Sequence, residues 1–207
     1  MSRLTDLQLR FWAERGYLIV KGAFSPSDIF ALRGLAAGVL DNAEARRRFR
    51  SILDGALQAV AHDLVGEDVV TLDVARRGPA SSPFHLDAWL TSDVGNRSIF
   101  LLVALTDIGG ETAPLFYPGS HLFASEGSES KGRTPAEMAR LTTWLSGDGQ
   151  KVVGLTCAAG DIWVRHPRLL HGSTSGSADD WLGLEARCLP VASLPRNPAM
   201  ADIFGSV

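Results

Sequence analysis

Three residues of the sequence have the types and spacing of a metal site. His85 and Asp87 are separated by one residue, so on an extended strand an imidazole and a carboxylate point to the same face. Such a pair also arises by chance on protein surfaces, and a site needs a third ligand. His171 lies far enough downstream for several strands to bring the chain back to the pair. Two histidines and one carboxylate are typical of non-haem ferrous iron, whereas zinc more often takes a closed tetrahedral site or a third nitrogen ligand.

Other common chemistries lack their motifs. The sequence has no Gly-x-Gly-x-x-Gly after a strand and no Walker-type phosphate loop. Thr174 stands where a nucleophile elbow of the form Gly-x-Ser-x-Gly requires serine. Cys157 and Cys188 have no CxxC partner, and we expect both to be small buried hydrophobic residues.

The elements that must position the three candidate ligands fall into two groups. Residues 1–68 are mostly helical by their apolar spacing, with Thr5 and Ser27 as N-caps and an apolar strand at Gly16–Val20. From residue 69 to 191, short β-rich runs alternate with turn residues, which predicts a sandwich, jelly roll or barrel. The predicted strands are Val69–Val74, Ser98–Leu105, Pro114–Tyr117, Lys151–Thr156, Asp161–Val164 and Leu182–Val191. Ser125–Arg133 is either a lid or an ordinary surface excursion, and Pro135–Leu145 has helical spacing.

Composition sets the class of protein. A chain of 207 residues with 45% hydrophobic and 21% charged residues is expected to form one globular domain over 1–207. Its longest apolar run, Ile99–Leu105, is far shorter than the roughly 18 residues of a membrane span. The amino terminus lacks the apolar region of a signal peptide, so we expect a cytoplasmic protein. A net charge of −3 argues against nucleic-acid binding, and we interpret Arg46–Arg50 as a solvated helix face.

Four motifs in order carry a resemblance to a known family. Leu4–Ser25 is similar to an opening helix, a Gly-Tyr strand and the start of a second helix, and His85-x-Asp87 follows in the middle of the chain. Ala113–His121 ends in Pro-Gly-Ser-His, and Gly160–Val164 leads to His171-Gly-Ser. In these motifs the chain resembles the phytanoyl-CoA dioxygenase family of iron- and 2-oxoglutarate-dependent oxygenases.

This resemblance implies a fold and a ligand set. The fold is a double-stranded β-helix of the cupin-like jelly-roll type, mainly β with flanking helices, in which 1–68 is the helical flank and 69–191 the core. His85, Asp87 and His171 would hold Fe(II), with 2-oxoglutarate and O2 as cosubstrates. His121 would satisfy the turn after a strand, and His166 would support the iron-binding strand.

The sequence departs from the family at the arginine that pairs with the far carboxylate of 2-oxoglutarate. That arginine usually lies about a dozen residues after the distal histidine, where this chain has Trp181-Leu182. Ser173 matches the serine that assists it. Arg187 is the nearest downstream substitute, unless it forms a salt bridge with Glu185 or another surface acid, and Arg97 is the second candidate.

The reaction implied by the resemblance is hydroxylation of a small molecule at a C–H bond, with release of succinate and CO2. Related halogenases have a small residue where this chain has Asp87, so hydroxylation, desaturation or ring formation is favoured over halogenation. Trp89 and Arg76 are candidates for the substrate pocket, although each could serve packing or the surface. Two other functions stay open: a binding or regulatory jelly roll that has lost the cosubstrate, and a cupin-like metal enzyme that does not use 2-oxoglutarate.

Overall fold

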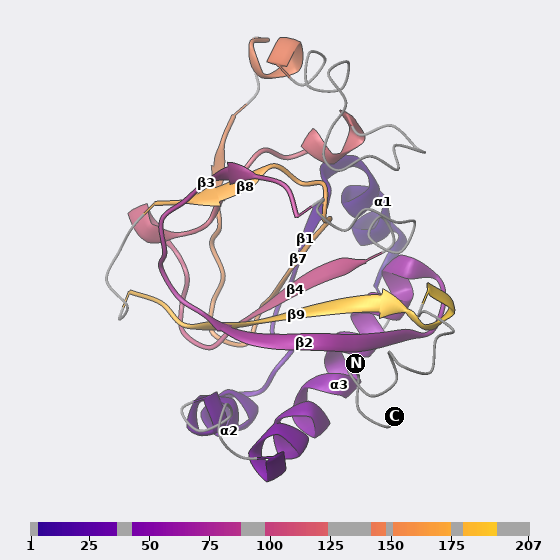
Figure 1. The fold of residues 1–207 in the computed structure, drawn as a ribbon, viewed down its shortest axis with the longest axis vertical. Coiled ribbons are helices and arrows are strands. Elements are labelled where there is room, and N and C mark those ends of the chain that lie inside the picture. The colour runs from indigo at the N-terminus through magenta and orange to yellow at the C-terminus, as the bar shows by residue number, and fades with distance from the viewer. Residues whose placement is uncertain are drawn as a thin grey trace.

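The computed structural model describes residues 4–36, 43–87, 98–123, 142–147, 151–174 and 180–193. These ranges contain three helices, nine strands, a further helical turn at 142–145 and three short 3-10 turns (Figure 1). The helices are α1 (Asp6–Arg15), α2 (Pro26–Ala36) and α3 (Ala43–Val65). The strands are β1 (Tyr17–Val20), β2 (Val69–Arg77), β3 (Ser82–His85), β4 (Ile99–Ala104), β5 (Leu115–Phe116), β6 (Val153–Gly154), β7 (Ile162–Arg165), β8 (His171–Ser173) and β9 (Gly183–Pro190). The 3-10 turns are η1 (Gly110–Thr112), η2 (Ser120–Phe123) and η3 (Val191–Ser193).

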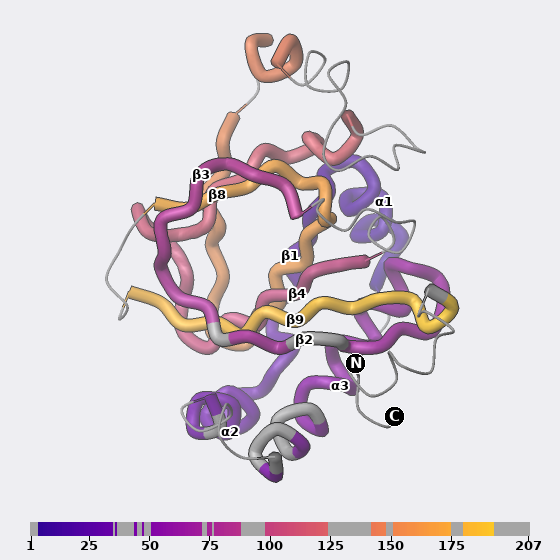
Figure 2. Tube along the Cα trace, viewed as in Figure 1, coloured from indigo at the N-terminus to yellow at the C-terminus, as the bar shows by residue number. Residues whose placement is uncertain are grey.

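The strands form two sheets, which confirms the expected jelly roll. The larger sheet has the order β1-β7-β4-β9-β2 and the smaller one β3-β8-β5-β6, with antiparallel pairing throughout. The chain passes from the end of β2 into β3, and so from one sheet to the other (Figure 2).

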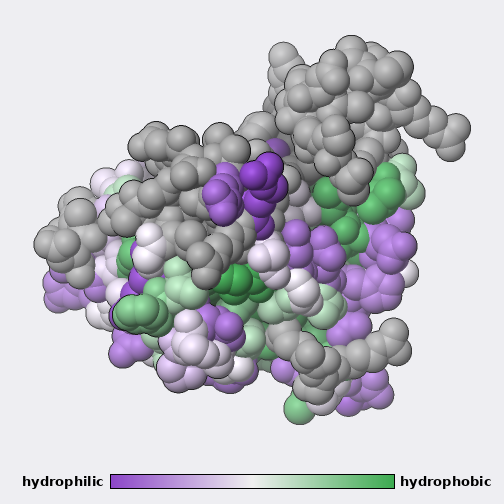
Figure 3. All heavy atoms as spheres, turned by 90° about the horizontal axis from the view of Figure 1, so that it is seen from below, coloured by the Kyte–Doolittle hydropathy of each residue, from purple (hydrophilic) through white to green (hydrophobic). Residues whose placement is uncertain are grey.

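The two faces of the larger sheet have different partners. Along β4 every residue is buried, because alternate side chains point to opposite faces and both faces are covered. Leu101 and Val103 belong to the outer cluster, which includes Leu32 of α2 and Leu57 of α3. Leu102 belongs to the inner cluster between the sheets. The helices α2 and α3 lie below the larger sheet (Figure 1), and the face seen from below mixes hydrophilic and apolar side chains (Figure 3).

The helical flank follows the sequence prediction with one correction. Thr5 caps α1, with a hydrogen bond from the Gln8 N–H and the reciprocal bond that completes a capping box, as predicted. The cap at the start of α2 is Ser25 rather than Ser27, because the Ser25 hydroxyl accepts from the Asp28 N–H while the Asp28 carboxylate accepts from the Ser25 N–H. A Ser–Asp capping box therefore starts α2 two residues earlier than predicted.

The predicted strands and loops have different outcomes. All six runs predicted from residue 69 onward contain a strand, although β5 and β6 are only two residues long. The strands β3 and β8 were not among the predicted runs. Ser125–Arg133 lies outside the described residues, as does most of Pro135–Leu145, of which 142–145 is helical. Within the part of the chain that the structure describes, no helix is long and apolar enough to cross a bilayer.

The end of α1 packs closely against the turn after β5, and Gly16 lies at this contact. Gly16 caps α1 in the left-handed conformation (φ 72°), and a Cβ placed on it would lie 2.7 Å from Cγ of His121. His121 Nε2 donates a hydrogen bond to the Ala13 carbonyl oxygen (3.1 Å), and the Gly119 N–H donates to the Arg15 carbonyl oxygen (2.8 Å). His121 therefore joins its turn to the last turn of α1.

We expect Gly16→Ala to destabilise the protein through both backbone strain and the His121 contact. Gly22 is the matched control, because it also has a positive φ (58°) but an added Cβ would meet nothing within 4 Å. Gly22→Ala should cost about 1–2 kcal/mol from strain alone, and Gly16→Ala about 1–3 kcal/mol more from overpacking, in urea unfolding. In a His121→Ala background the two glycine variants should lose similar stability; a persistent excess for Gly16→Ala would contradict this explanation.

Candidate metal centre

Two neighbouring strands bring the candidate ligands together. His85 at the end of β3 pairs in register with His171 at the start of β8, and their ring centroids are 4.4 Å apart. Asp87 lies two residues beyond the end of β3, where its N–H donates to the Pro167 carbonyl oxygen (3.1 Å). The loop before β8 therefore positions Asp87 beside the two imidazoles.

The three side chains present a compatible set of donor atoms. Nε2 of His85 lies 3.8 Å and Nε2 of His171 3.7 Å from carboxylate oxygens of Asp87, and one ligand atom from each residue lies within 4.8 Å of the others. Two ligand atoms that share an ion at about 2.1 Å lie about 3–4.2 Å apart, so the measured pairs are in range. His171 Nδ1 contacts the Leu169 carbonyl oxygen (2.9 Å) and His85 Nδ1 that of Pro83 (2.8 Å). These contacts place the ring protons on Nδ1 and leave both Nε2 lone pairs for a metal.

Burial keeps the distal histidine neutral. His171 is buried, and this burial together with the positive charge of Arg165 lowers the pKa of His171 to about 3. A neutral imidazole is the form that binds a metal. His85 is more exposed, with 42% of its side-chain surface accessible, so the site has one buried and one open side.

Arg165 is a buried cation beside the candidate ligands that sequence reasoning missed. Its side chain is 5% exposed, with Nη1 in contact with the Asp87 carboxylate and Nη2 donating to Glu185 (2.8 Å). Its guanidinium carbon lies 4.3 Å from the centre of the Phe100 ring. Burial lowers the pKa of Arg165, and the Glu185 carboxylate opposes that shift. One signal was available: Trp163 and Arg165 are two apart on β7 and share a face, so an inward tryptophan implies an inward arginine.

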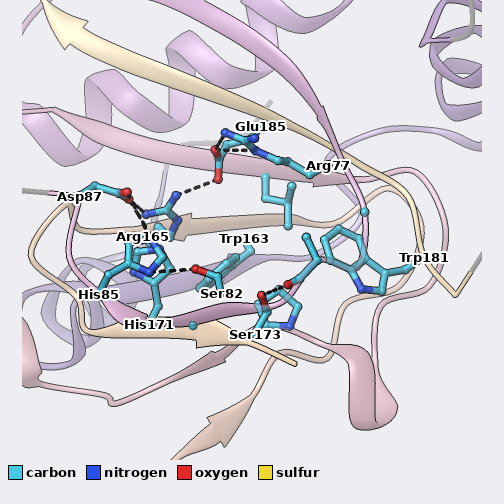
Figure 4. A pocket seen from close by; sticks show the side chains of 15 residues that line it. Arg77, Ser82, His85, Asp87, Trp163, Arg165, His171, Ser173, Trp181 and Glu185 are labelled. Atoms are coloured by element: carbon cyan, nitrogen blue, oxygen red, sulfur yellow. Dashed lines mark hydrogen bonds and ion pairs between the residues drawn. The ribbon is translucent and has the colours of Figure 1, made fainter. Parts of the chain in front are cut away.

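A second cation completes a chain of charges. Arg77 on β2 donates from Nε (3.0 Å) and Nη2 (2.8 Å) to one oxygen of Glu185, whose other oxygen bonds Arg165. Burial alone would raise the pKa of Glu185, but the two guanidinium groups hold it below its usual value. The partners of Glu185 are therefore Arg165 and Arg77, and the order along the chain of charges is Asp87–Arg165–Glu185–Arg77 (Figure 4).

A cavity of about 260 Å³ is lined by the three candidate ligands and by the charged side chains of Arg165, Glu185 and Arg77 (Figure 4). Ser173, predicted to bind the cosubstrate, lines this cavity, and its hydroxyl donates to the Ala80 carbonyl oxygen. Arg187 is not among the lining residues. Trp89 and Arg97 lie outside the described residues, and Arg76 is on β2 but its side chain is outside the described part of the chain.

The donor set fits a divalent ion of the first transition series. Two neutral imidazole nitrogens and one carboxylate oxygen supply three ligands, and the cavity leaves room on the open side for others. The hydrogen bonds that orient both imidazoles are of the kind that supports metal ligands in proteins. The cluster is therefore a candidate metal centre in its chemistry as well as in its geometry.

Comparisons with known proteins agree with this geometry. Residues 42–180 match the family model of phytanoyl-CoA dioxygenase (PhyH). The fold is similar to the non-heme alpha ketoglutarate dependent carbocyclase SnoK from nogalamycin biosynthesis (TM-score 0.69, 19% identity, 90% of this chain and 84% of that chain). It is also similar to EctD from S. alaskensis with bound Fe (0.69, 16%, 91% and 78%) and to HygX from Streptomyces hygroscopicus with nickel and 2-oxoglutarate bound (0.63, 17%, 92% and 88%). At these identities the likeness establishes the fold. No curated protein matches this chain.

His166 lies in the loop that leads from β7 to the distal ligand. Its N–H donates to the Gly16 carbonyl oxygen (2.9 Å), its Nδ1 accepts from the Arg168 N–H (3.1 Å), and its ring packs near Trp12 and His121. Burial, with His121 and Arg168 nearby, lowers the pKa of His166 from 6.5 to about 3. Its contacts are thus with the helical flank rather than with the candidate ligands.

We expect this histidine to make stability depend on pH. Between about pH 6.5 and 3 the unfolded state binds a proton at His166 that the folded state does not, so stability falls as the pH drops through this window. His166→Asn keeps an acceptor for the Arg168 N–H and removes the titrating group. The slope of unfolding free energy against pH between 6 and 4 should become shallower by up to about 1.4 kcal/mol per pH unit. Denaturant titrations at several pH values would measure it, and equal slopes would contradict the assignment.

Proposed function

This chain belongs to the phytanoyl-CoA dioxygenase family, and we propose on that premise that it hydroxylates a small molecule at a C–H bond as an Fe(II)- and 2-oxoglutarate-dependent dioxygenase. The observation that carries this proposal is the convergence of His85, Asp87 and His171 on one position of a charged cavity. Fe(II) held there would supply the oxidising chemistry, with O2 and 2-oxoglutarate consumed and succinate and CO2 released.

The residues around the cavity have defined tasks in this proposal. His85 and His171 would hold the metal through Nε2, with both rings oriented by carbonyl oxygens. Asp87 would supply the carboxylate ligand and is oriented by its N–H bond to Pro167 and by Arg165. Its carboxylate occupies the ligand position that a halogenase would need for chloride, which supports hydroxylation rather than halogenation.

The size of the cavity supports a small substrate. A volume of about 260 Å³ is slightly below the range of about 300–1,000 Å³ that ligand pockets usually have. Such a space suits a short dicarboxylate and part of a second small molecule. We further propose that the whole chain is one oxygenase domain, because α2 and α3 pack on the outer face of the sheet whose inner face lines the cavity.

Asp87→Ala should abolish the reaction by removing one metal ligand and its negative charge. Purified protein with Fe(II), 2-oxoglutarate and O2 should form succinate even without the natural substrate, and the Asp87→Ala variant should form none above the protein-free background. Asp68→Ala is a matched control, because the Asp68 carboxylate is 92% exposed and lies outside the residues that line the cavity. Succinate formation at the full rate by Asp87→Ala would show that the residue is not a ligand.

The same assay separates the two alternative functions. A wild-type protein that binds Fe(II) tightly but forms no succinate would favour a cupin-like metal enzyme without 2-oxoglutarate. A protein that binds no metal, judged by elemental analysis after dialysis, would favour a binding or regulatory jelly roll.

A further inference from the structure

We infer that Arg77, on the first strand of the larger sheet after the helical flank, pairs with the far carboxylate of 2-oxoglutarate. This inference rests on the proposed function and assigns a residue to it. It replaces Arg187, the residue that sequence spacing suggests, with a cation from a different strand.

The far carboxylate of a bound 2-oxoglutarate would need a cationic partner in the cavity. Among the described residues, the charged side chains that line the cavity are two carboxylates, Asp87 and Glu185, and two guanidinium groups, Arg165 and Arg77, so their charges cancel. The two positive charges of a divalent ion and the two negative charges of the cosubstrate would also cancel, so the filled cavity would be neutral. An unpaired carboxylate inside a protein is strongly unfavourable, so the far end of the dianion must meet a cation.

The beginning of β9 presents no side chain to the cavity at Gly183. Glu185 faces the cavity, so Gly183, two residues earlier on β9, lies on the same inner face. A Cβ on Gly183 would lie 2.8 Å from Cδ1 of Leu102 and 3.2 Å from the Val103 carbonyl oxygen. A side chain at this position would require the Leu102 side chain to shift, and Gly183 itself leaves this part of the inner face of β9 without a side chain.

Arg77 lies directly opposite this glycine. In the antiparallel pairing of β2 with β9, Arg77 is the partner of Gly183, and directly paired residues project to the same face. Its guanidinium reaches Glu185, and the residue lines the cavity. Arg77 therefore presents its side chain on the inner face beside the position that Gly183 leaves open.

Of the two arginines that line the cavity, Arg77 has N–H donors that are not used by Asp87 or Glu185. Arg165 is 5% exposed and uses both terminal nitrogens on carboxylates, Nη1 on Asp87 and Nη2 on Glu185. The side chain of Arg77 is 52% exposed, and Nε and Nη2 both donate to the same Glu185 oxygen. Within the described residues no contact of Arg77 Nη1 is found, and a guanidinium carries five N–H donors. Arg77 can thus keep Glu185 and still bind a second carboxylate.

Arg187 lies further along β9 and pairs with a different residue of β4. It pairs with Phe100, whereas Glu185 pairs with Leu102 and Gly183 with Ala104. The row of Phe100 and Arg187 also contains Arg165, which contacts the candidate metal ligand Asp87. Arg187 is therefore four residues along β9 from Gly183, and it does not line the cavity.

The test compares two ligands that differ only at the far end. Isothermal titration of the Ni(II)-loaded protein under nitrogen would measure the Kd of 2-oxoglutarate and of 2-oxopentanoate, which has a methyl group in place of the far carboxylate. We expect Arg77→Gln to raise the Kd of 2-oxoglutarate by about 10- to 150-fold, the range for a charge-assisted hydrogen bond of about 1.5–3 kcal/mol. The Kd of 2-oxopentanoate should change by less than about twofold. Ni(II) affinity should be unchanged.

Two further variants make the result specific. Arg187→Gln, the matched control, should bind both ligands as the wild type does. Arg77→Lys retains a positive charge and should retain part of the preference for the dicarboxylate. Folding should survive in both Arg77 variants because Glu185 keeps its bond to Arg165 (2.8 Å), and thermal melting would confirm it.

Four outcomes would overturn the inference. An equal loss for both ligands in Arg77→Gln would mean that Arg77 only supports the fold. A selective loss of 2-oxoglutarate in Arg187→Gln but not in Arg77→Gln would return the role to Arg187. A wild-type protein that binds Ni(II) but shows no affinity for either 2-oxo acid would refute the proposed function itself, whereas unchanged preference in Arg77→Gln refutes only the assignment of the anchor.

Discussion

One buried guanidinium holds together the interior of this jelly roll. Arg165 joins Asp87 at the end of one sheet to Glu185 in the middle of the other, and its side chain is almost fully buried. Burial of such a charge is strongly unfavourable unless carboxylates and polarisable neighbours compensate for it, and here two carboxylates and the ring of Phe100 do so. Removal of Arg165 would leave two buried carboxylates without that cation, one of them a candidate metal ligand. The geometry of the metal centre and the stability of the core therefore depend on the same residue.

The larger sheet separates structural support from chemistry by its two faces. Along β4, Leu101 and Val103 pack against the helices, while Phe100 and Leu102 face the interior where the charged residues lie. Because both faces are covered, β4 reads as a continuous apolar run rather than as an alternating one. The helical flank thus shields one face of the sheet from water, and the opposite face is free to carry polar side chains aimed at a ligand.

Much of this arrangement could be predicted from the sequence. The Thr5 capping box and the long apolar strands have local signals, whereas the spacing of His85 and Asp87 is a weak signal alone and became a candidate site only together with His171. The strands β3 and β8 were missed because they are short, contain proline or glycine and histidine, and show no apolar alternation. The roles of Arg165, Glu185 and Arg77 depend on pairing between β2, β7 and β9, which lie far apart in the sequence. Local patterns can indicate which face of a strand is buried, but they do not show which distant strands pair with one another.

The pairing of β1 with β7 and of β3 with β8 also sets the order of events when the chain is made. Residues 17–20 must wait for residues 162–165 to form their ladder, and His85 must wait for His171. Contacts so distant in sequence form slowly, since each must first overcome the entropy of closing a long loop. During synthesis the amino-terminal helices can form early, but the candidate metal centre and the network of charged residues can form only after β8 and β9 have left the ribosome. A chain interrupted before residue 171 would therefore lack the candidate ligand His171 and the strand that pairs with His85, whatever metal the cell supplied.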